Sequence, residues 1–324
     1  MKQHKVLEIS MDDVTKVIKA TKPSTSLASI EKYNSFKLDY ERRTHPELKE
    51  ATEGAIYIDD VVGLDAAKKA LYEAVEVPIL HPNLVKRYDL QNIKGILLFG
   101  PPGTGKTMLM KAVANELDDV ALITLSGSDM AKNGLENSLT MIRDTFNRAR
   151  ENAPAIIFVD EIDALLPTRN DASELSIQVT SEFLQQVDGI KQSAGIILVG
   201  ASNRPDILDA SILRPGRIDK FIFVSPPNKS ERQQLFKMNL KKAPCEKNIA
   251  FEKLAEETDG YTGADIANIC REAKMQALER TISEEKEKLI DTDSIINIIR
   301  NIKPSAPPSS LSRYVKFLSI YGGR

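Results

Sequence analysis

The stretch Gly100-Pro101-Pro102-Gly103-Thr104-Gly105-Lys106-Thr107 decides the fold of this chain. It fits the pattern G-x-x-x-x-G-K-[ST] of a phosphate-binding loop. An apolar run at 95–99 precedes it, and apolar residues at helical spacing follow it over 108–117. A chance Gly/Pro-rich turn is the alternative, and the strand before and the helix after disfavour it. The loop therefore predicts a nucleotide site, because its bare N–H groups and the helix N-terminus attract phosphate.

The side chains of this loop suggest how a nucleotide and its metal are held. Lys106 is expected to reach the β and γ phosphates, and the Thr107 hydroxyl to ligate Mg²⁺. ATP or ADP with Mg²⁺ is therefore the predicted ligand. The residues expected to touch the nucleotide from this part of the chain are Pro102, Gly103, Thr104, Gly105, Lys106, Thr107 and Met108.

Composition sets broad limits on the function. The chain has 324 residues, of which 42% are hydrophobic and 28% charged, as in ordinary globular proteins of two or three packed units. A formal net charge of −2 gives no reason to expect nucleic acid as a partner. No apolar run approaches the roughly 20 residues of a membrane span. The two distant cysteines, Cys245 and Cys270, suit a reducing cytosol, so a cytoplasmic location is predicted.

Apolar strands alternate with helical segments up to residue 224. The expected strands are 95–99, 120–125, 155–159, 195–200 and 221–224, and the expected helices are 65–79, 108–117, 137–152 and 173–187. Pro78 and Pro82 are expected to end the first of these helices. The alternation predicts an α/β fold of the P-loop NTPase class, a parallel sheet flanked by helices.

After Pro226-Pro227 the pattern becomes purely helical. Helices are expected at 229–241, 250–258, 263–284, 292–302 and 309–321. The predicted domains are a helical N-terminal segment and linker (1–54), a large α/β nucleotide-binding domain (55–226), a small all-α lid (227–302) and a C-terminal helix (303–324).

Polar residues follow two of the apolar strands. Asp160 and Glu161 end the strand at 155–159, beside the phosphate loop of a doubly wound sheet. Asp160 is expected to hold Mg²⁺ through water, and Glu161 to act as general base on the attacking water. Solvated carboxylates are the alternative, which the phosphate loop disfavours. Asn203 follows the next strand, where it either orients water or only forms a turn before Pro205.

Two arginines lie on the turn-like segment 213–219. Arg214 and Arg217 could clamp phosphoryl charge, delivered in trans to a neighbouring subunit. The alternative is a surface salt bridge with Asp219, and the residues alone favour that alternative.

From about residue 57 onward the sequence resembles the AAA ATPases, most closely the valosin-containing-protein type and its archaeal relatives. The matching segments are Gly-Pro-Pro-Gly-Thr-Gly-Lys-Thr at 100–107, Ile-Ile-Phe-Val-Asp-Glu-Ile-Asp at 156–163, Ser-Asn-Arg-Pro at 202–205, Leu-Arg-Pro-Gly-Arg-Ile-Asp at 213–219 and Gly-Tyr-Thr-Gly-Ala-Asp at 260–265. The resemblance implies an ATPase that forms a hexameric ring of identical subunits and pulls protein substrates through its pore.

The resemblance also implies residue roles. Asn203 would be the first sensor, and Arg214 and Arg217 the trans arginine fingers. The residues implied around the adenine are Asp60, Val61, Val62, Gly63 and Tyr261, with Gly263 and Ala264 on the sensor helix of the lid.

The sequence departs from the family at three places. The first pore loop, expected within 132–136, lacks the aromatic of many relatives, so grip on a polypeptide would be weak or would rest on Leu135. Gln178 stands where relatives often carry an arginine, which puts coupling between neighbours in doubt. Val62 replaces a frequent glycine beside the adenine.

The two ends of the chain resemble each other. Lys22-Pro23-Ser24 matches Lys303-Pro304-Ser305, and at the same offset Tyr33, Phe36 and Tyr40 match identical aromatics. Chance similarity between two amphipathic helix pairs is the alternative. Our preferred interpretation is that residues 1–40 are the tail of a preceding AAA module, so that the chain is the second half of a tandem protein.

The leading functional hypothesis is an ATP-hydrolysing ring motor that unfolds, extracts or disassembles proteins. The alternatives are a remodeller of filaments or membrane scaffolds, as in the katanin and spastin relatives, and a nucleotide-binding scaffold that hydrolyses weakly. The presence of Glu161, Asn203, Arg214 and Arg217 argues against the scaffold.

Overall fold

The computed structural model describes residues 56–89, 93–117, 120–132, 134–168, 173–190, 195–285 and 287–322. The chain divides into two units, Met1–Glu53 and Gly54–Arg324, and every element below belongs to the second. The predicted helical segment 1–54 and the repeat over 1–40 lie outside the described residues. In the described parts of the chain, no helix is both long and apolar enough to cross a membrane.

The centre of the large domain is a parallel sheet of five strands. The strands are β1 (Gly95–Phe99), β2 (Ala121–Ser126), β3 (Ala155–Asp160), β4 (Ile196–Ser202) and β5 (Lys220–Phe223), in the order β2-β3-β4-β1-β5. Each predicted strand is confirmed: β1 has the predicted bounds, and the ends of the other strands differ by at most two residues. Because β1 pairs with β4 and β4 with β3, the loops that follow these three strands meet at one edge of the sheet.

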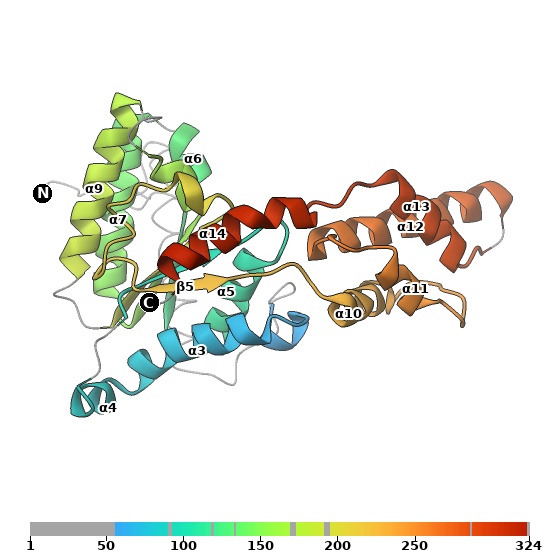
Figure 1. Ribbon diagram of the computed structural model, residues 1–324, viewed down its shortest axis with the longest axis horizontal. Helices are drawn as coiled ribbons and strands as arrows, with labels where there is room; N and C mark the ends of the chain where they lie inside the picture. Colours follow the sequence, from blue (N-terminus) through green and yellow to red (C-terminus); the bar gives the residue numbers. More distant parts are fainter. Residues whose placement is uncertain are drawn as a thin grey trace, which may run out of the picture. The chain divides into compact units, whose positions relative to one another are not determined.

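Side chains alternate between the two faces of this sheet. Leu97, Phe99 and Ile157 pack with α7 (Leu135–Glu151), α8 (Ile162–Leu165), α9 (Glu174–Ile190) and α14 (Ser312–Tyr321). Ile96, Leu98 and Phe158 pack with α3 (Asp65–Leu80) and α5 (Lys106–Glu116) on the opposite face. Figure 1 shows α3 and α5 on one side of β5, and it shows α7 and α9 packed side by side. The central strands are therefore buried on both faces, which explains their continuous apolar runs.

Helix α3 differs from the sequence prediction at its end. It continues through Pro78 to Leu80, and the N–H of His81 still bonds the carbonyl of Val77 over 3.0 Å. The prediction that Pro78 ends this helix was wrong, because a proline in the last turn removes one hydrogen bond without preventing the turn. Pro82 instead begins the short helix α4 (Pro82–Arg87), a position that suits proline.

The lid is a small helical domain with its own core. It consists of α10 (Lys229–Leu240), α11 (Phe251–Glu256), α12 (Gly263–Glu284) and α13 (Thr292–Asn301). Phe236, Leu254 and Ile269 lie in the cluster that these helices bury. The first turns of α10 and α12 are closed by capping boxes, from Asn228 with Glu231 and from Thr262 with Asp265.

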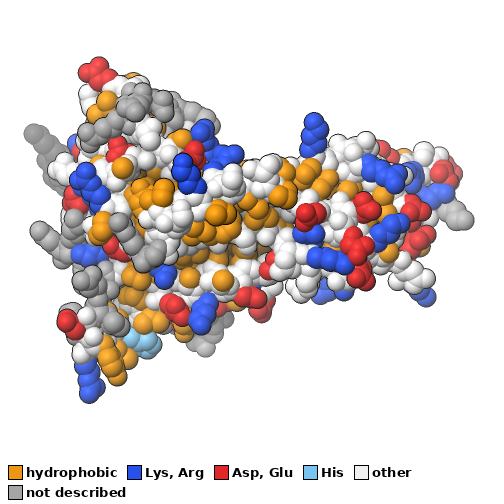
Figure 2. All heavy atoms as spheres, viewed as in Figure 1, with side chains coloured by type: hydrophobic (Ala, Val, Ile, Leu, Met, Phe, Trp, Pro, Cys, Tyr) orange, Lys and Arg blue, Asp and Glu red, His pale blue; other side chains and the backbone are white. Residues whose placement is uncertain are grey.

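The C-terminal helix packs with the large domain. Tyr314 and Phe317 of α14 are buried in the same cluster as Phe99 and Phe221 of the sheet. Figure 1 shows α14 lying over β5, and in Figure 2 hydrophobic side chains gather along it. The predicted helix at 309–321 is confirmed as a 3₁₀ turn over Pro308–Leu311 followed by α14, and its core contacts belong to the large domain.

Candidate nucleotide site

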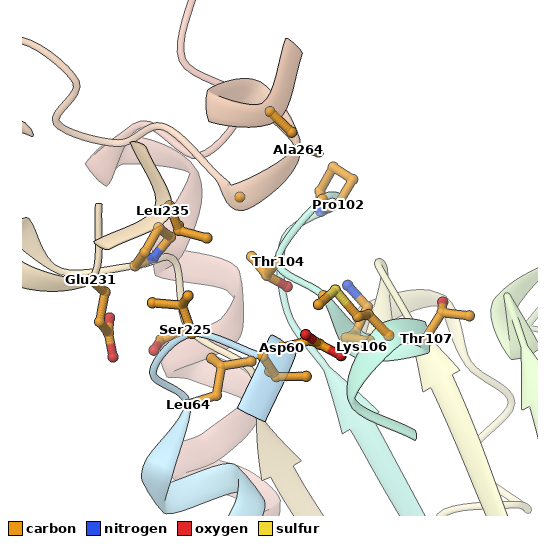
Figure 3. Close-up of a pocket in the computed structure, with 18 of the residues that line it drawn as sticks. Asp60, Leu64, Pro102, Thr104, Lys106, Thr107, Ser225, Glu231, Leu235 and Ala264 are labelled. Carbon is orange, nitrogen blue, oxygen red and sulfur yellow. The ribbon is translucent and has the colours of Figure 1, made fainter. Parts of the chain in front are cut away.

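A cavity of about 580 Å³ lies between the sheet edge and the lid (Figure 3). Its size is within the range of small-molecule sites in proteins. Predicted site residues that line it are Asp60, Val61, Val62, Pro102, Gly103, Thr104, Gly105, Lys106, Thr107, Met108, Asp160, Glu161, Asn203, Gly263 and Ala264. The structure thus brings together the phosphate loop, the ends of β3 and β4, and the first turn of α12.

The phosphate loop has the backbone that its glycines permit. Gly103 and Gly105 have φ values of +74° and +94°, a region that favours glycine. A Cβ on Gly103 would come within 2.7 Å of the Thr262 hydroxyl oxygen and 2.9 Å of the Ala264 Cβ. The N–H of Ala264 also donates to the Gly103 carbonyl over 3.2 Å. Glycine at 103 is therefore required both by the turn and by the close approach of the lid.

Lys106 is buried, with only 7% of the residue exposed. Its ammonium donates to the carbonyls of Gly100 at 2.9 Å and Pro101 at 2.8 Å. Burial lowers the pKa of Lys106 from 10.5 to about 8, although the nearby charges of Asp160 and Asp163 act in the opposite direction. The loop thus holds a poorly solvated cation, for which an anionic phosphate would be a strong partner.

Thr107 and Asp160 meet at the start of α5. The Thr107 hydroxyl donates to a carboxylate oxygen of Asp160 over 2.7 Å, so two hard oxygen donors lie together at the phosphate loop. Mg²⁺ prefers such oxygen ligands and keeps several waters. The residues present fit this metal: Thr107 and Asp160 would hold it, and when bound it would neutralise phosphate charge.

Glu161 and Asn203 line the same cavity from β3 and β4. Glu161 is exposed, and its backbone has the unusual left-handed φ of +50°, a strain often found at functional positions. Its N–H donates to Asp160 over 3.0 Å. Asn203 is held by its own carbonyl, which accepts a hydrogen bond from the Tyr314 hydroxyl over 2.8 Å. An acceptor carboxylate and a carboxamide at one cavity wall can jointly orient a water.

Two residues predicted beside the adenine lie elsewhere. Tyr261 is buried in the lid core, where its hydroxyl donates to the carbonyls of Ile299 and Ile302, so its side chain does not line the cavity. The ring completes the small lid core, so the cavity lining gives no support to a contact between Tyr261 and the adenine, which stays a prediction. Gly63 is also outside the cavity wall, and a Cβ there would clash with the carboxylate of Glu231.

The lid supplies cavity residues that the sequence analysis missed. They are Glu231, Leu235, Met238 and Asn239 of α10 and Ala267 of α12, joined by Leu64, Ser225 and Pro227 from the segments around them. Figure 3 shows Leu235 and Glu231 on the lid side of the cavity. The spacing of 235, 238 and 239 on α10 places them on one helical face, a signal that could have been read from the sequence.

The two candidate finger arginines do not line the cavity of their own chain. Arg217 donates to both carboxylate oxygens of Asp188, at 3.1 and 2.7 Å, and to the Ser211 carbonyl at 2.8 Å. The suggested salt bridge with Asp219 was wrong, because the Asp219 carboxylate accepts the N–H groups of Lys94 and Gly216. Arg214 is exposed on the same turn.

Leu135, the apolar candidate of the pore loop, begins α7 and is partly buried against the core of the large domain. It is therefore only partly available to contact another polypeptide.

Comparisons with known proteins agree with this geometry. The family described as "ATPase family associated with various cellular activities (AAA)" matches residues 96–226, and the "AAA+ lid domain" family matches residues 248–292. The chain belongs to the AAA family. The fold is the AAA arrangement of a P-loop domain and a helical lid.

Individual relatives cover most of the chain. "Cell division cycle protein 48 homolog" of Archaeoglobus fulgidus is 38% identical over 275 residues, which are 81% of this chain and 37% of that protein. "Protein SAV" of Sulfolobus acidocaldarius is 41% identical over 248 residues, 76% of this chain and 32% of that protein. "Proteasome-activating nucleotidase" of Methanocaldococcus jannaschii is 40% identical over 224 residues, 68% of this chain and 52% of that protein. The chain thus spans about a third to a half of the length of these relatives.

Proposed function

We propose that the chain is the ATP-hydrolysing subunit of a homo-oligomeric ring, of the hexameric type, that remodels or unfolds protein substrates in the cytoplasm. The cavity supports the proposal, because it gathers the phosphate loop, two magnesium donors, an acceptor carboxylate and a carboxamide. The relatives named for cell division cycle protein 48 and for proteasome activation support a motor acting on proteins.

In the proposed mechanism each residue acts on one part of Mg²⁺-ATP. Lys106 and the loop N–H groups bind the phosphates, and Thr107 with Asp160 holds the metal. Glu161 accepts a proton from the attacking water, and Asn203 orients that water. The apolar lining from Val61, Leu64, Leu235 and Ala264 excludes water around the adenine ring of the nucleotide.

The arginines support action between subunits. Neither Arg214 nor Arg217 lines the cavity of its own chain, so a role on transferring phosphate requires a neighbouring site. The bidentate pair with Asp188 holds the Arg217 guanidinium in one orientation, with 17% of its side chain exposed. We infer that this pair presents the segment to the neighbour, and that Arg214, which is exposed, makes the closer approach.

The proposed pore loop, within residues 132–136, offers few side chains that could hold a substrate polypeptide. The segment 132–136 carries no aromatic, and Leu135 is partly buried. We propose that the ring pulls with less force than relatives with an aromatic pore loop, which suits disassembly of complexes more than unfolding of stable domains.

One experiment tests this function. The oligomeric state of the purified protein is measured by analytical ultracentrifugation in the presence of ATP. The Glu161→Gln variant is measured in the same way, because it is expected to bind ATP without hydrolysing it. Unfolding of a destabilised, tagged fluorescent protein is then followed by loss of emission. We expect both proteins to form a ring when ATP is present. We expect the wild-type protein to unfold the fluorescent substrate slowly and the Glu161→Gln variant not to unfold it. ATP hydrolysis by a protein that stays monomeric would contradict the ring proposal.

A further inference from the structure

The C-terminal helix reaches the catalytic edge of the sheet through a buried tyrosine. Tyr314 is 2% exposed, and its hydroxyl donates to the backbone carbonyl of Asn203 over 2.8 Å, although the two residues are 111 apart in the chain. Asn203 lines the cavity and Tyr314 does not. A residue outside the cavity therefore holds the backbone of a residue inside it.

Aromatic packing fixes the position of this hydroxyl. The Tyr314 ring lies 5.8 Å from the ring of Phe223 on β5. One turn later, the Phe317 ring lies 4.9 Å from that of Phe99, the last residue of β1 and the neighbour of the phosphate loop. These four rings thus hold α14 in one register on the sheet, and a shift of the helix would move the hydroxyl away from Asn203.

The segment before α14 is bonded to the cavity wall of the lid. The Ser305 hydroxyl and N–H donate to Asp265 at 2.6 and 3.2 Å, and the Ala306 N–H donates to the Gly260 carbonyl at 3.0 Å. Asp265 lies in the first turn of α12, next to Gly263 and Ala264, which line the cavity. The chain between 305 and 314 therefore connects the lid wall of the cavity with Asn203.

We propose that Tyr314 is a positioning residue for ATP hydrolysis, which fixes the carboxamide of Asn203 and links it to the lid through residues 305–311. The proposal rests on the proposed role of Asn203. The carbonyl that accepts the bond belongs to the same residue as the carboxamide, so losing the bond frees the torsions that aim the amide at the water. A misplacement of that kind affects the chemical step more than the binding of substrate.

Tyr314→Phe tests this directly, because it removes the hydroxyl and keeps the ring that packs on Phe223. We expect the turnover number to fall about 2- to 10-fold, the range of one net hydrogen bond, with the KM and the dissociation constant for ATP unchanged. Thr258→Val is the matched control. It removes a buried hydroxyl that also donates to backbone carbonyls, but in the lid. Turnover of the Thr258→Val variant should stay at the wild-type value.

A double-mutant cycle decides whether Tyr314 acts through Asn203. In the Asn203→Ala background the carboxamide is already absent, so Tyr314→Phe should cause no further loss of turnover. An equal loss in both backgrounds would overturn the proposal. If Asn203→Ala is slow and Tyr314→Phe turns over at the wild-type rate, the proposal for Tyr314 is overturned and the role of Asn203 stands. If Asn203→Ala itself turns over at the wild-type rate, the proposed role of Asn203 is overturned as well. Thermal unfolding of each variant confirms that the fold is retained.

Discussion

The Thr107 hydroxyl and the Asp160 carboxylate are joined by a hydrogen bond of 2.7 Å between the start of α5 and the end of β3. This contact holds together the two side chains proposed as magnesium ligands, so the proposed metal site would be preorganised by the fold. The two residues lie far apart in the chain, and the β1-β4-β3 order of the sheet is what brings them close.

Asp160→Asn should weaken the metal site while keeping an oxygen for the Thr107 hydroxyl. We expect the Mg²⁺ concentration at half-maximal ATPase activity to rise roughly 10- to 100-fold, the range seen for residues that act on a metal through an outer shell. Magnesium titrations at saturating ATP measure this. Asp206→Asn, a carboxylate on the surface paired with Arg204, should leave the titration unchanged.

The ATPase should lose efficiency at alkaline pH. Burial lowers the pKa of Lys106 to about 8, so above that pH the free protein loses the cation that binds phosphate. We expect kcat/KM for ATP to be flat below pH 8 and to fall toward tenfold per pH unit above it. Unfolding through Lys106 would not explain this fall in kcat/KM. Because the pKa of Lys106 is lower in the folded protein, the unfolded chain binds more protons between pH 8 and 10.5, so the contribution of Lys106 to the free energy of unfolding rises over this range. A flat profile to pH 10 would contradict the role of Lys106.

Arg217→Ala and Arg214→Ala should each reduce turnover, by roughly 10³-fold if the residue acts as a finger. The action in trans is tested by mixing. Arg217→Ala subunits and Lys106→Ala subunits, each inactive, should regain activity in mixed rings, because one supplies a competent pocket and the other the arginines. Asp188→Asn is the control that separates the ion pair of Arg217 with Asp188 from the proposed action of Arg217 on a neighbouring site. This variant removes the ion pair and leaves the guanidinium. Mixed rings that stay inactive would point to a role within one chain.

Gly63→Ala should weaken ATP binding through the lid. A Cβ at this position would displace the Glu231 carboxylate from the edge of the cavity, and φ is +64°. Overpacking of this kind typically costs about 1–3 kcal/mol, so isothermal titration should show affinity reduced roughly 5- to 150-fold. Adding Glu231→Ala removes the clash and should restore part of the affinity. Full loss in both backgrounds would assign the effect to backbone strain alone.

The sequence predicted the fold and the phosphate side of the cavity well, since these depend on local patterns. The apolar run before Gly100 and the carboxylates after Val159 each identify a strand end, and parallel strands bring their ends together. Long-range packing was harder to foresee. Whether the Tyr261 ring faces the adenine or the lid core depends on how much space α13 leaves, and no local pattern encodes that.

The partner of Arg217 was missed for a similar reason. Asp219 is close in the chain, but backbone N–H groups already occupy its carboxylate, and Asp188 at the end of α9 approaches only in the folded protein. The contact between Tyr314 and Asn203 belongs to the same class, because it joins residues that are 111 apart in the chain.

The central claim is that this cavity hydrolyses ATP with Glu161 as the base. Glu161→Gln tests it most directly, because the amide keeps the size of the side chain and cannot accept the proton. ATP binding is measured by titration calorimetry and phosphate release by a coupled assay on the same preparations. We expect wild-type affinity with turnover reduced at least about 100-fold. Turnover at the wild-type rate would contradict the assignment of the base and, with it, the mechanism proposed for this site.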